Sequence, residues 1–372
     1  MRPTWAEVDV DTIATNSRLL RARISPSALC AVVKADGYGH GAVAVAEAAR
    51  RGGATWLAVA LVEEGVELRE AGIEGPILVL SEPRASEMAD AHRADLRPTL
   101  YTDAGIDAAA AAASAVHQPW YVHVKVDTGM HRVGVAPEHV CALADRIDAR
   151  EELRLEGVWT HCAVADEPHD PFTATQLDRF DDAVAALVSS GRSVHEKPAA
   201  NSAGGLAHPR GRYDLVRAGI AVYGIAPSTH VALPAGVEPA LRLRSEVTHV
   251  QTVAPGEGVS YGRRWIAERP TRVATVPIGY ADGIRRDLPA RGGEVLVRGV
   301  RLPMAGVVTM DQLMVDCRDV PVEVGDEVVL IGRQGDEQIT AEQIADRLGT
   351  IGYEVVCAIG ARVPRRVLGE RA

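Results

Sequence analysis

The amino-acid sequence predicts an α/β protein in which a (β/α)8 barrel of the TIM type is followed by a mostly antiparallel β domain. Short apolar runs rich in Val, Leu, Tyr and Trp alternate with helical stretches through the first part of the chain, as buried parallel strands and their connecting helices do. A proline-punctuated stretch then ends the alternation, and strand-like segments dominate beyond it. The length of 372 residues suits a barrel with an added domain.

Eight segments are expected to be barrel strands because they are short, apolar and regularly spaced. They are Leu29–Lys34, Trp56–Ala60, Ile77–Leu80, Arg97–Tyr101, Tyr121–Val126, Leu155–His161, Ser193–Ala199 and Tyr213–Arg217. The segments between them show the apolar spacing of about 3.6 residues that is typical of helices. The predicted helices are Gly41–Arg51, Val62–Ala71, Ala85–Ala94, Asp103–Val116, Pro137–Arg150 and Thr173–Ser190.

Pro227, Pro234 and Pro239 mark the expected linker to the second domain. We therefore assign residues 1–230 to the barrel and 231–372 to the β domain, and we expect the first roughly 10 residues to pair with that β domain. The predicted strands are Arg242–Val253, Arg272–Ile278, Glu294–Val297, Leu313–Asp316, Asp326–Ile331 and Tyr353–Ile359.

One helix is predicted in the β domain, at Ala341–Leu348. Thr340 precedes it and Gln343 follows three residues later, which is the pattern of a capping box.

Composition excludes several classes of protein. Apolar residues make up 47% and charged residues 24%, the mixture of a globular protein. A net charge of −10 argues against a nucleic-acid or anionic-membrane partner. No apolar run approaches the roughly 18 residues that span a bilayer, and no signal peptide is visible. The five cysteines form no CxxC pair, so we expect a reduced, soluble, cytoplasmic protein without a disulfide framework or thiolate zinc site.

Lysine is rare in this chain, which makes each lysine a candidate for amine chemistry. Only Lys34, Lys125 and Lys197 are present among forty basic residues. Lys34 ends an apolar strand and enters a glycine-rich turn, and functional residues of barrels lie at such strand ends. An amine there is suited to Schiff-base formation. The alternative is a surface lysine whose stem covers a strand edge.

A phosphate site is expected after the last two barrel strands. Ser202, Gly219 and Ile220 lie there, where barrels frequently bind phosphate through backbone N–H groups and a hydroxyl. The alternative is that the glycines serve only the turns. A phosphate site together with an imine-forming lysine would suit pyridoxal phosphate. His161 is open to three interpretations: a core histidine, a ring that stacks on a planar cofactor, or a metal ligand. The last is the weakest, because no HxH or HExxH pattern accompanies it.

Gly258–Gly262 matches the G-x-S-x-G pattern of hydrolases. That pattern requires a strand, a turn and a helix, and a histidine later in the chain. The last histidine is His249, before Ser260, and the surroundings are strand-like. The hydrolase interpretation is therefore excluded.

A series of motifs resembles the bacterial alanine racemase family. The segment Ala31–Gly41, AVVKADGYGHG, resembles the family's pyridoxal-phosphate attachment signature. The resemblance continues in the family's order over nearly the whole chain. The further matching segments are Lys125–Arg132, Thr160–His161, Ala165–Glu167, Ala200–Ser202, Arg217–Gly224, Val259–Gly262, Ile278–Gly283, Met310–Gln312 and Gly352–Glu354.

The resemblance implies a fold-type III, pyridoxal-phosphate-dependent isomerase that interconverts L-alanine and D-alanine and supplies D-alanine for peptidoglycan. Lys34 would hold the cofactor and act as one catalytic base, and Tyr261 of the partner subunit in a homodimer would be the other. Removing a proton from one face of Cα and returning it on the other needs two bases. The remaining implied roles are phosphate binding by Tyr38, Ser202, Gly219, Ile220 and Tyr353, ring packing by His161, a hydrogen bond to the ring nitrogen from Arg217, substrate binding by Arg132 and Met310, and support from Lys125, Tyr280 and Asp311.

The chain departs from the family pattern at several positions. Asp36–Gly37 stands where Asn-Ala is commoner, His131 where glycine is usual, and Thr309 where cysteine is frequent. Glycine at 37 is permissive, so the turn should survive. Lys125 is carbamylated in some relatives, and the alternative here is a plain ion pair with an acid such as Asp127.

Three other functions remain as alternatives. A broader-specificity or serine-preferring racemase would differ in few pocket residues. An amino-acid decarboxylase with the same architecture is usually longer and has a cysteine-containing substrate motif that is not found here. A non-catalytic cofactor carrier would not need Tyr261 opposite Lys34.

Overall fold

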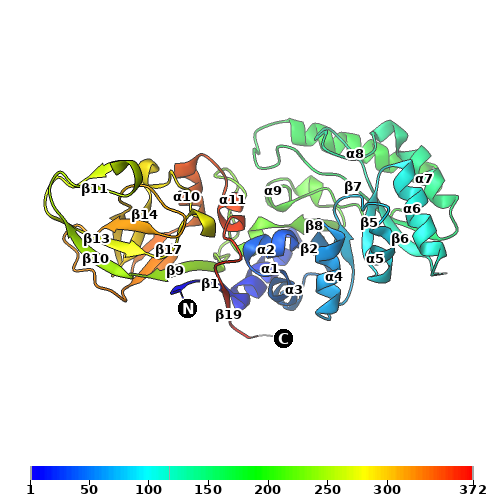
Figure 1. Cartoon of the computed structure of the whole chain (residues 1–372). Helices are drawn as coiled ribbons and strands as arrows, with labels where there is room; N and C mark the ends of the chain where they lie inside the picture. The colour runs from blue at the N-terminus through cyan, green and yellow to red at the C-terminus, as the bar shows by residue number, and fades with distance from the viewer. Residues whose placement is uncertain (1, 117, 371–372) are drawn as a thin grey trace. The chain divides into compact units, whose positions relative to one another are not determined.

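The computed structural model describes residues 2–116 and 118–370. The chain forms two compact units (Figure 1). The barrel unit comprises Ile13–Gly37 and Gly41–Glu238, and the β unit comprises the segment up to Thr12, Tyr38–His40 and Pro239–Glu370. Within the described residues, the helices are all too short or too polar to cross a membrane.

The barrel unit is built on a seven-stranded sheet in which every pairing is parallel. The strand order is β7-β6-β5-β4-β3-β2-β8. Most positions of these strands are buried, which is why they appear in the sequence as nearly continuous apolar runs. Their bounds are β2 Ala28–Val32, β3 Trp56–Val59, β4 Ile77–Val79, β5 Arg97–Leu100, β6 Trp120–Lys125, β7 Leu153–Trp159 and β8 Leu215–Ala218.

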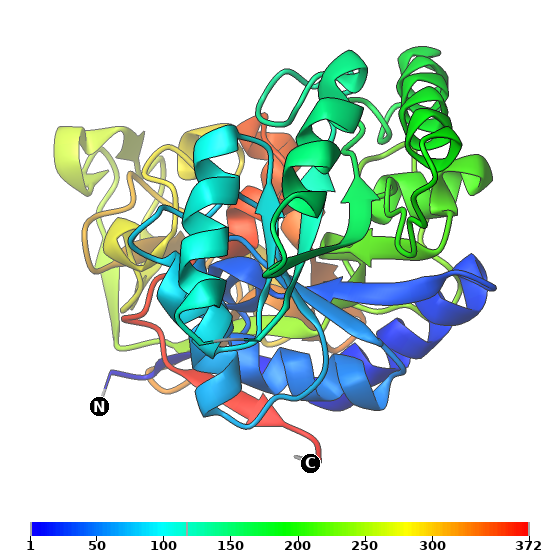
Figure 2. The ribbon, with the colours of Figure 1, turned by 90° about the vertical axis from the view of Figure 1, so that its right-hand side faces the viewer.

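Helices lie outside these strands (Figure 2). All six predicted helices are confirmed, with ends that differ by a few residues. They are α3 Ala42–Arg51, α4 Val62–Glu70, α5 Met88–Arg93, α6 Asp103–Ser114, η1 Pro137–His139 continued by α7 Val140–Asp148, and α8 Phe172–Ser189. A further helix, α1 Val10–Ile24, was not predicted. Its buried positions include Asn16 and Ser17, which bond to backbone carbonyls, so its apolar periodicity is weak.

The strand predicted at Ser193–Ala199 is wrong. This segment forms only an isolated parallel bridge, between Glu196 and Gly157 of β7. It nevertheless occupies the place of an eighth strand, because Thr160 N donates to Pro198 O at 3.3 Å and Arg217 N of β8 donates to Ala200 O at 3.0 Å. Proline has no N–H and cannot complete a regular ladder. The segment therefore joins the two edges of the sheet without being a regular strand.

The β unit has three antiparallel or mixed sheets. The largest has the order β15-β14-β17-β9-β1-β19, with β18 on β17, and the smaller ones are β10-β13-β16 and β11-β12. β1 runs antiparallel to β9 and parallel to β19. The bounds are β1 Thr4–Asp9, β9 Leu241–Glu246, β10 His249–Val253, β11 Gly258–Val259, β12 Trp265–Ile266, β13 Thr271–Val276, β14 Glu294–Val297, β15 Val300–Pro303, β16 Leu313–Asp316, β17 Glu327–Gln334, β18 Glu337–Ile339 and β19 Arg365–Leu368.

Helix α10, Ala341–Leu348, has its predicted bounds, and Thr340 and Gln343 form the capping box. The strand predicted at Tyr353–Ile359 is wrong, because Gly352–Cys357 is the helix α11. Its buried residues, Gly352 and Val356, are four positions apart, as on one helix face. The run Tyr-Glu-Val-Val is rich in strand formers, and tertiary packing overrides that preference.

The remaining short helices lie in connections: α2 Lys34–Gly39, α9 Ser202–Ala207, η2 Pro209–Arg212, η3 Ile220–Tyr223, η4 Tyr261–Arg263, η5 Tyr280–Asp282 and η6 Pro289–Arg291. The predicted fold class, a parallel α/β barrel-type sheet followed by a mostly antiparallel β domain, is confirmed.

Candidate functional site

Lys34 lies at the first position of α2, just beyond the end of β2 at Val32. The following backbone is left-handed, since every residue from Ala35 to Gly39 has a φ between 51° and 79°. Each residue other than glycine costs roughly 1–2 kcal/mol of conformational free energy when its backbone is left-handed. A strained turn of this kind is kept only where the surrounding structure holds it in place. Lys34 therefore lies next to a segment whose conformation is fixed.

Two contacts within the barrel unit fix this turn. Gly37 N donates to Val33 O at 2.8 Å, and Asp36 Oδ1 accepts from Ala42 N, at the start of α3, at 2.9 Å. Asp and Gly are the residues that tolerate left-handed backbone best. The unusual pair Asp36–Gly37 therefore suits the observed conformation.

Arg217 of β8 is almost completely buried, at 2% exposure. Its Nη1 donates to Pro198 O at 2.7 Å, and its Nη2 donates to Thr160 O at 2.7 Å and Ala199 O at 3.2 Å. Burial lowers the pKa of Arg217 to about 10, which leaves the guanidinium charged at neutral pH. Carbonyls from two neighbouring segments thus hold one buried cation in a fixed orientation.

His161 lies beside this cation, with Nδ1 3.2 Å from Arg217 Nη2. Burial and then the charges of Arg217, Arg132, Lys125 and Lys34 hold the pKa of His161 well below its ordinary value of 6.5. The imidazole is therefore neutral at neutral pH. A neutral, flat ring is suited to packing against another planar group. Because Arg217 Nη2 can only donate, His161 Nδ1 accepts its hydrogen bond and the ring hydrogen is on Nε2.

Lys125, the last residue of β6, is 1% exposed. Its Nζ donates to Val133 O at 2.9 Å and lies 5.1 Å from the ring centre of Trp159. Burial, followed by repulsion from Arg132 and Arg217, lowers the pKa of Lys125 to about 8. Lys125 thus has a larger neutral fraction than an ordinary lysine.

His131 precedes Arg132 in a turn closed by Asp127. Asp127 Oδ1 accepts from Gly129 N and from His131 N, each at 3.0 Å. The φ of His131 is +54°, a conformation that glycine adopts at no steric cost. This explains why a glycine suits position 131. The His131 side chain is exposed, with Nδ1 3.2 Å from Asp127 Oδ2.

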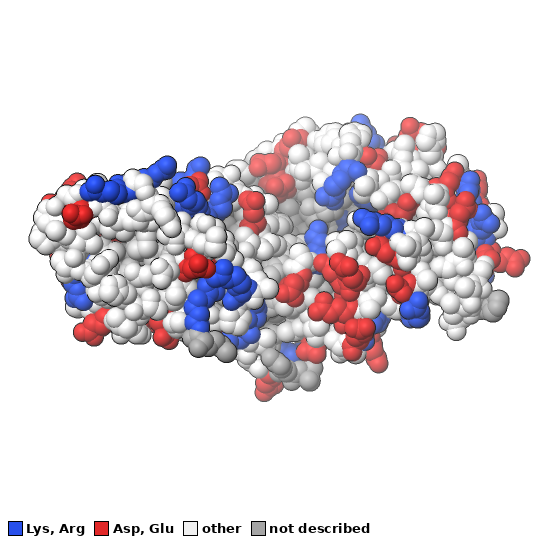
Figure 3. All heavy atoms as spheres, in the orientation of Figure 1, with Lys and Arg blue, Asp and Glu red and all other residues white. Residues whose placement is uncertain are grey.

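Positive charge therefore converges on one part of the barrel unit. Lys34, Lys125, Arg132 and Arg217 all act on His161, in a chain whose net charge is −10. On the face of the molecule shown in Figure 3, in contrast, both acidic and basic side chains are present. A concentration of cations in a sheltered site is suited to an anionic ligand.

Ser202 begins α9 and lies against the turn after β8. Its Oγ accepts from Gly219 N at 2.9 Å and from Ala221 N at 3.4 Å. A hydroxyl and successive backbone N–H groups are the usual means by which proteins hold phosphate.

Gly204 and Gly205 have a packing role. A Cβ at Gly205 would lie 2.6 Å from Val216 Cγ1, and one at Gly204 would lie 3.0 Å from Ala200 Cβ. Gly205 thus lets α9 approach β8, and Gly204 lets it pack against Ala200, just before the helix.

Tyr38 and Tyr353 lie together in the β unit. Their ring centres are 6.1 Å apart at an interplanar angle of 50°. Burial, and then the neighbouring Tyr353, raise the pKa of Tyr38. Tyr38 therefore stays a neutral hydroxyl, which can donate a hydrogen bond.

The η5 turn holds the backbone around Met310. Tyr280 N donates to Thr309 O at 2.9 Å, and Ala281 N donates to Met310 O at 3.1 Å. Gly279 lies so close that a Cβ there would be 2.3 Å from Met310 O. The turn therefore fixes where the Met310 peptide lies.

Asp311 and Asp282 are tied together through Arg362. Arg362 contacts Asp311 at 2.6 Å and the buried Asp282 at 3.2 Å. Asp282 also accepts two hydrogen bonds from Arg2, at 2.7 and 2.8 Å.

Tyr261 begins η4 and is 70% exposed. The preceding Ser260 has a φ of +64°, and its hydroxyl donates to Val307 O at 2.8 Å. Ser260 is thus engaged as a structural hydrogen-bond donor.

No group of three or more His, Cys, Asp and Glu side chains within residues 2–116 and 118–370 could hold a metal ion.

The structure brings predicted barrel residues together around His161: Arg217 Nη2 lies 3.2 Å from its Nδ1, and the charges of Lys34, Lys125, Arg132 and Arg217 all lower its pKa. Sequence reasoning missed Trp159, whose ring lies 4.6 Å from the Arg217 guanidinium and 5.1 Å from Lys125 Nζ. Its position two residues before His161, at the end of a predicted strand, is a signal that could have identified it.

Comparison with known proteins gives full-length matches. The family model "Alanine racemase, N-terminal domain" matches residues 8–227, and "Alanine racemase, C-terminal domain" matches residues 240–367. The alanine racemase of Symbiobacterium thermophilum is 48% identical over 100% of this chain and 99% of its own length. That of Desulfovibrio desulfuricans is 43% identical over 98% of each.

Solved structures agree. The alanine racemase from D-cycloserine-producing Streptomyces lavendulae has a TM-score of 0.95 at 41% identity, covering 100% of this chain and 98% of that one. The alanine racemase from Bacillus anthracis with bound L-Ala-P has a TM-score of 0.93 at 38% identity, covering 99% and 96%.

Proposed function

The chain belongs to the alanine racemase family, and from this premise we propose that it interconverts L-alanine and D-alanine with pyridoxal phosphate as cofactor. The observation that carries the proposal is the set of four cations around the neutral His161, next to a turn that begins at Lys34. We further propose that the enzyme acts in the cytoplasm and supplies D-alanine for peptidoglycan.

The residues present suit this cofactor. Lys34 has the primary amine that forms the covalent link, and Ser202, Gly219 and Ile220 offer a hydroxyl and backbone N–H groups for the phosphate, with Tyr38 and Tyr353 as further hydroxyl donors. His161, whose pKa is lowered by burial and by the neighbouring cations, offers a flat ring to pack on the pyridine. When bound, pyridoxal phosphate supplies the electron sink that makes the Cα proton of an amino acid acidic.

Arg217 controls which reaction follows. Its Nη groups are engaged by backbone carbonyls, so we assign Nε–H to the ring nitrogen. With a pKa of about 10, the guanidinium donates a hydrogen bond and keeps its proton. When bound, the cofactor would thus meet a hydrogen-bond donor at its ring nitrogen and gain no proton there, and it would supply a weaker electron sink than a protonated ring. Arg217 would in this way favour return of the proton to Cα.

Two bases on opposite faces of Cα are required for racemisation. We assign Lys34 to one face and Tyr261 to the other. Tyr261 lies in the β unit and is largely exposed in the single chain. We propose that it acts in the active site of a partner subunit, so that the enzyme is a homodimer with shared sites.

The substrate carboxylate is assigned to Arg132 and to the backbone at Met310. Lys125, Tyr280 and Asp311 support these groups: Tyr280 through its backbone bond to Thr309, Asp311 through Arg362, and Lys125 through its hydrogen bond to Val133 O, which follows Arg132 in the chain. The fixed carboxylate presents the Cα–H bond to the two bases.

The test of the reaction is exchange of the Cα proton in deuterium oxide with chiral analysis of the products. A racemase incorporates deuterium and inverts configuration starting from either enantiomer of alanine. Loss of carbon dioxide would indicate a decarboxylase, and the absence of both exchange and inversion would indicate a carrier. L-serine in a parallel reaction measures substrate breadth.

The shared site is tested by complementation. Mixed Lys34→Ala and Tyr261→Ala chains, each inactive alone, form heterodimers with one doubly defective site and one intact site. Random pairing restores roughly one quarter of wild-type activity. If subunit exchange is verified and no activity returns, Lys34 and Tyr261 of the same chain work together.

A further inference from the structure

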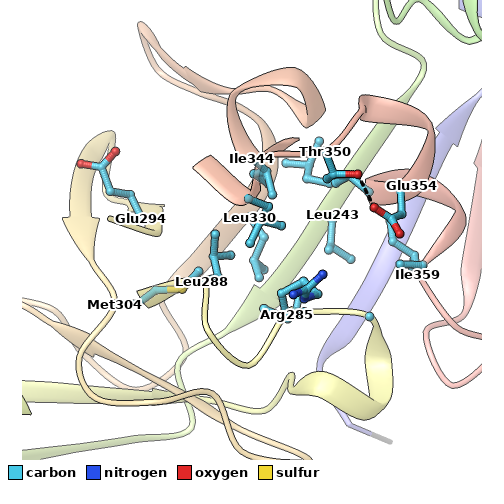
Figure 4. Close-up of a pocket in the computed structure, with 16 residues that line it drawn as sticks. Leu243, Arg285, Leu288, Glu294, Met304, Leu330, Ile344, Thr350, Glu354 and Ile359 are labelled. Carbon is cyan, nitrogen blue, oxygen red and sulfur yellow. Dashed lines mark hydrogen bonds between the residues drawn. The ribbon is translucent and has the colours of Figure 1, made fainter. Parts of the chain in front are cut away.

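The β unit contains an apolar cavity of about 110 Å³ that the proposed reaction does not use. It lies between the sheet, the segment Gly283–Leu288 and the helices α10 and α11 (Figure 4). Aliphatic side chains form most of its wall, among them Leu243, Leu330 and Ile344. An apolar cavity of roughly 150 Å³ holds benzene, so this one has room for a small branched aliphatic group.

Two opposite charges also line the cavity. Arg285 comes from the segment after η5, and Glu354 comes from α11. Arg285 makes one long ion pair, with Asp287 at 3.4 Å, and its side chain is 56% exposed. Glu354 accepts a hydrogen bond from Thr350, and a carboxylate has room for further donors. The third charged lining residue, Glu294, is already paired with Arg301 and Arg347.

We propose that this cavity binds a small aliphatic α-amino acid of the leucine class. Its side chain fills the hollow, its carboxylate pairs with Arg285, and its ammonium group pairs with Glu354. Alanine is a poor ligand here, because a methyl group leaves most of the cavity empty.

The walls of the cavity connect it to groups of the proposed active site. Glu354 and Val355 line it from α11, the helix that also carries Tyr353. Gly283 packs directly on the end of α11, since a Cβ there would lie 2.2 Å from Ala358 O. The η5 turn that precedes Gly283 holds the Met310 peptide.

Occupancy therefore stabilises the packing of α11, and with it the position of Tyr353. This coupling rests on the proposed function, in which Tyr353 binds the cofactor phosphate. Each ligand changes the affinity for the other by the same factor. We therefore expect the bound amino acid to strengthen cofactor binding and to slow the loss of the cofactor from the enzyme.

Binding is measured by equilibrium dialysis of radiolabelled L-leucine against the holoenzyme with saturating L-alanine present. One leucine binds per chain, and Arg285→Met weakens binding at least tenfold. Arg291→Met is the matched control, because Arg291 pairs with the same Asp287 at 2.8 Å but does not line the cavity; it changes the affinity less than twofold. Equal effects of the two variants, or complete displacement of leucine by alanine, would overturn the proposal.

Two further arms do not depend on the folding of a variant. 4-Methylpentanoate is leucine without its ammonium group and isopentylamine is leucine without its carboxylate, so each competes with leucine at least tenfold more weakly than unlabelled leucine does. 4-Methylpentanoate competing as well as leucine would show a site for aliphatic carboxylates and contradict the assignment of Glu354. A separate arm uses a second variant: Ile344→Trp, which fills the cavity, abolishes binding, and unchanged leucine binding by this variant would contradict the proposed site.

The coupling has its own readout. Saturating leucine slows the release of cofactor from diluted holoenzyme at least threefold, and an unchanged release rate with leucine bound would refute the coupling. Dialysis does not require turnover. Leucine binding in a protein that fails to racemise alanine would refute the proposed function and leave the cavity site intact.

Discussion

Replacement of Lys125 by methionine tests the electrostatics of the barrel site. Lys125 is buried at the end of β6, where burial and the cations Arg132 and Arg217 lower its pKa from 10.5 to about 8. Methionine fills a similar volume without a charge. The variant therefore removes the unfavourable burial of an ammonium group and leaves the packing largely intact.

The effect on stability depends on pH. Between pH 8 and pH 10.5 the unfolded chain binds more protons at Lys125 than the folded chain does, so stability rises with pH across this window. The destabilisation is fully present below pH 8 and disappears as the pH rises through 10.5. A shift from 10.5 to about 8 corresponds to about 3 kcal/mol. Between pH 7 and pH 9.5 the wild-type protein regains about 2 kcal/mol relative to Lys125→Met.

Urea unfolding in carbon-dioxide-free buffers at pH 7, 8, 9 and 9.5 measures this difference. Lys197→Met is the control, because the Lys197 ammonium pairs with Asp214 at 2.6 Å on a more exposed part of the chain. The free energy of unfolding of Lys125→Met should exceed that of the wild type at pH 7, with the excess shrinking towards pH 9.5. A constant difference over the whole range would refute the argument that Lys125 is a buried, charge-repelled amine.

Three further predictions concern the proposed site. Arg217→Glu should protonate the ring nitrogen and raise the ratio of transamination to racemisation by at least tenfold; an unchanged ratio in folded, cofactor-loaded protein would exclude this role for Arg217. Gly279→Ala should raise the KM for alanine at least tenfold, because the new Cβ would lie 2.3 Å from Met310 O. The control Gly360→Ala, whose new Cβ has its nearest neighbour at 3.6 Å, should leave KM within twofold of the wild-type value. Equal KM values for the two variants would contradict the carboxylate role of Met310. Borohydride reduction and peptide mapping should label Lys34, and a label on another lysine would reassign the cofactor link.

The sequence was sufficient to predict the features that depend on local pattern. Apolar runs located seven of the eight predicted barrel strands, and the capping residues located α10. Lys34 was identifiable because lysine is rare and the turn after it is rich in glycine. Ser193–Ala199 and α11 were mispredicted, because their conformations depend on neighbours that are distant in sequence: the edges of β7 and β8 in one case, and the buried pair Gly352 and Val356 in the other.

The candidate site was predictable as residue types but not as an electrostatic unit. Nothing local to Arg217 indicates that its guanidinium is held by the carbonyls of Thr160, Pro198 and Ala199. The depressed pKa of Lys125 likewise results from burial and from cations contributed by other strands and loops. Such effects require the tertiary structure, because they depend on distances between separate segments.

The position of Arg217 restricts how this protein can evolve. The same side chain that is assigned to the ring nitrogen also bridges the gap between β7 and β8, where the Ser193–Ala199 segment forms no regular strand. A single mutation that removed the guanidinium would take its donors away from the carbonyls of Thr160 and Ala199, whereas Pro198 O would keep its bond from Thr160 N. Each buried carbonyl left without a donor costs about 1–3 kcal/mol. A descendant with a different reaction would first need another way to close the sheet. We therefore expect Arg217 to be replaced only in relatives in which the Ser193–Ala199 segment is held to β7 and β8 by other hydrogen bonds.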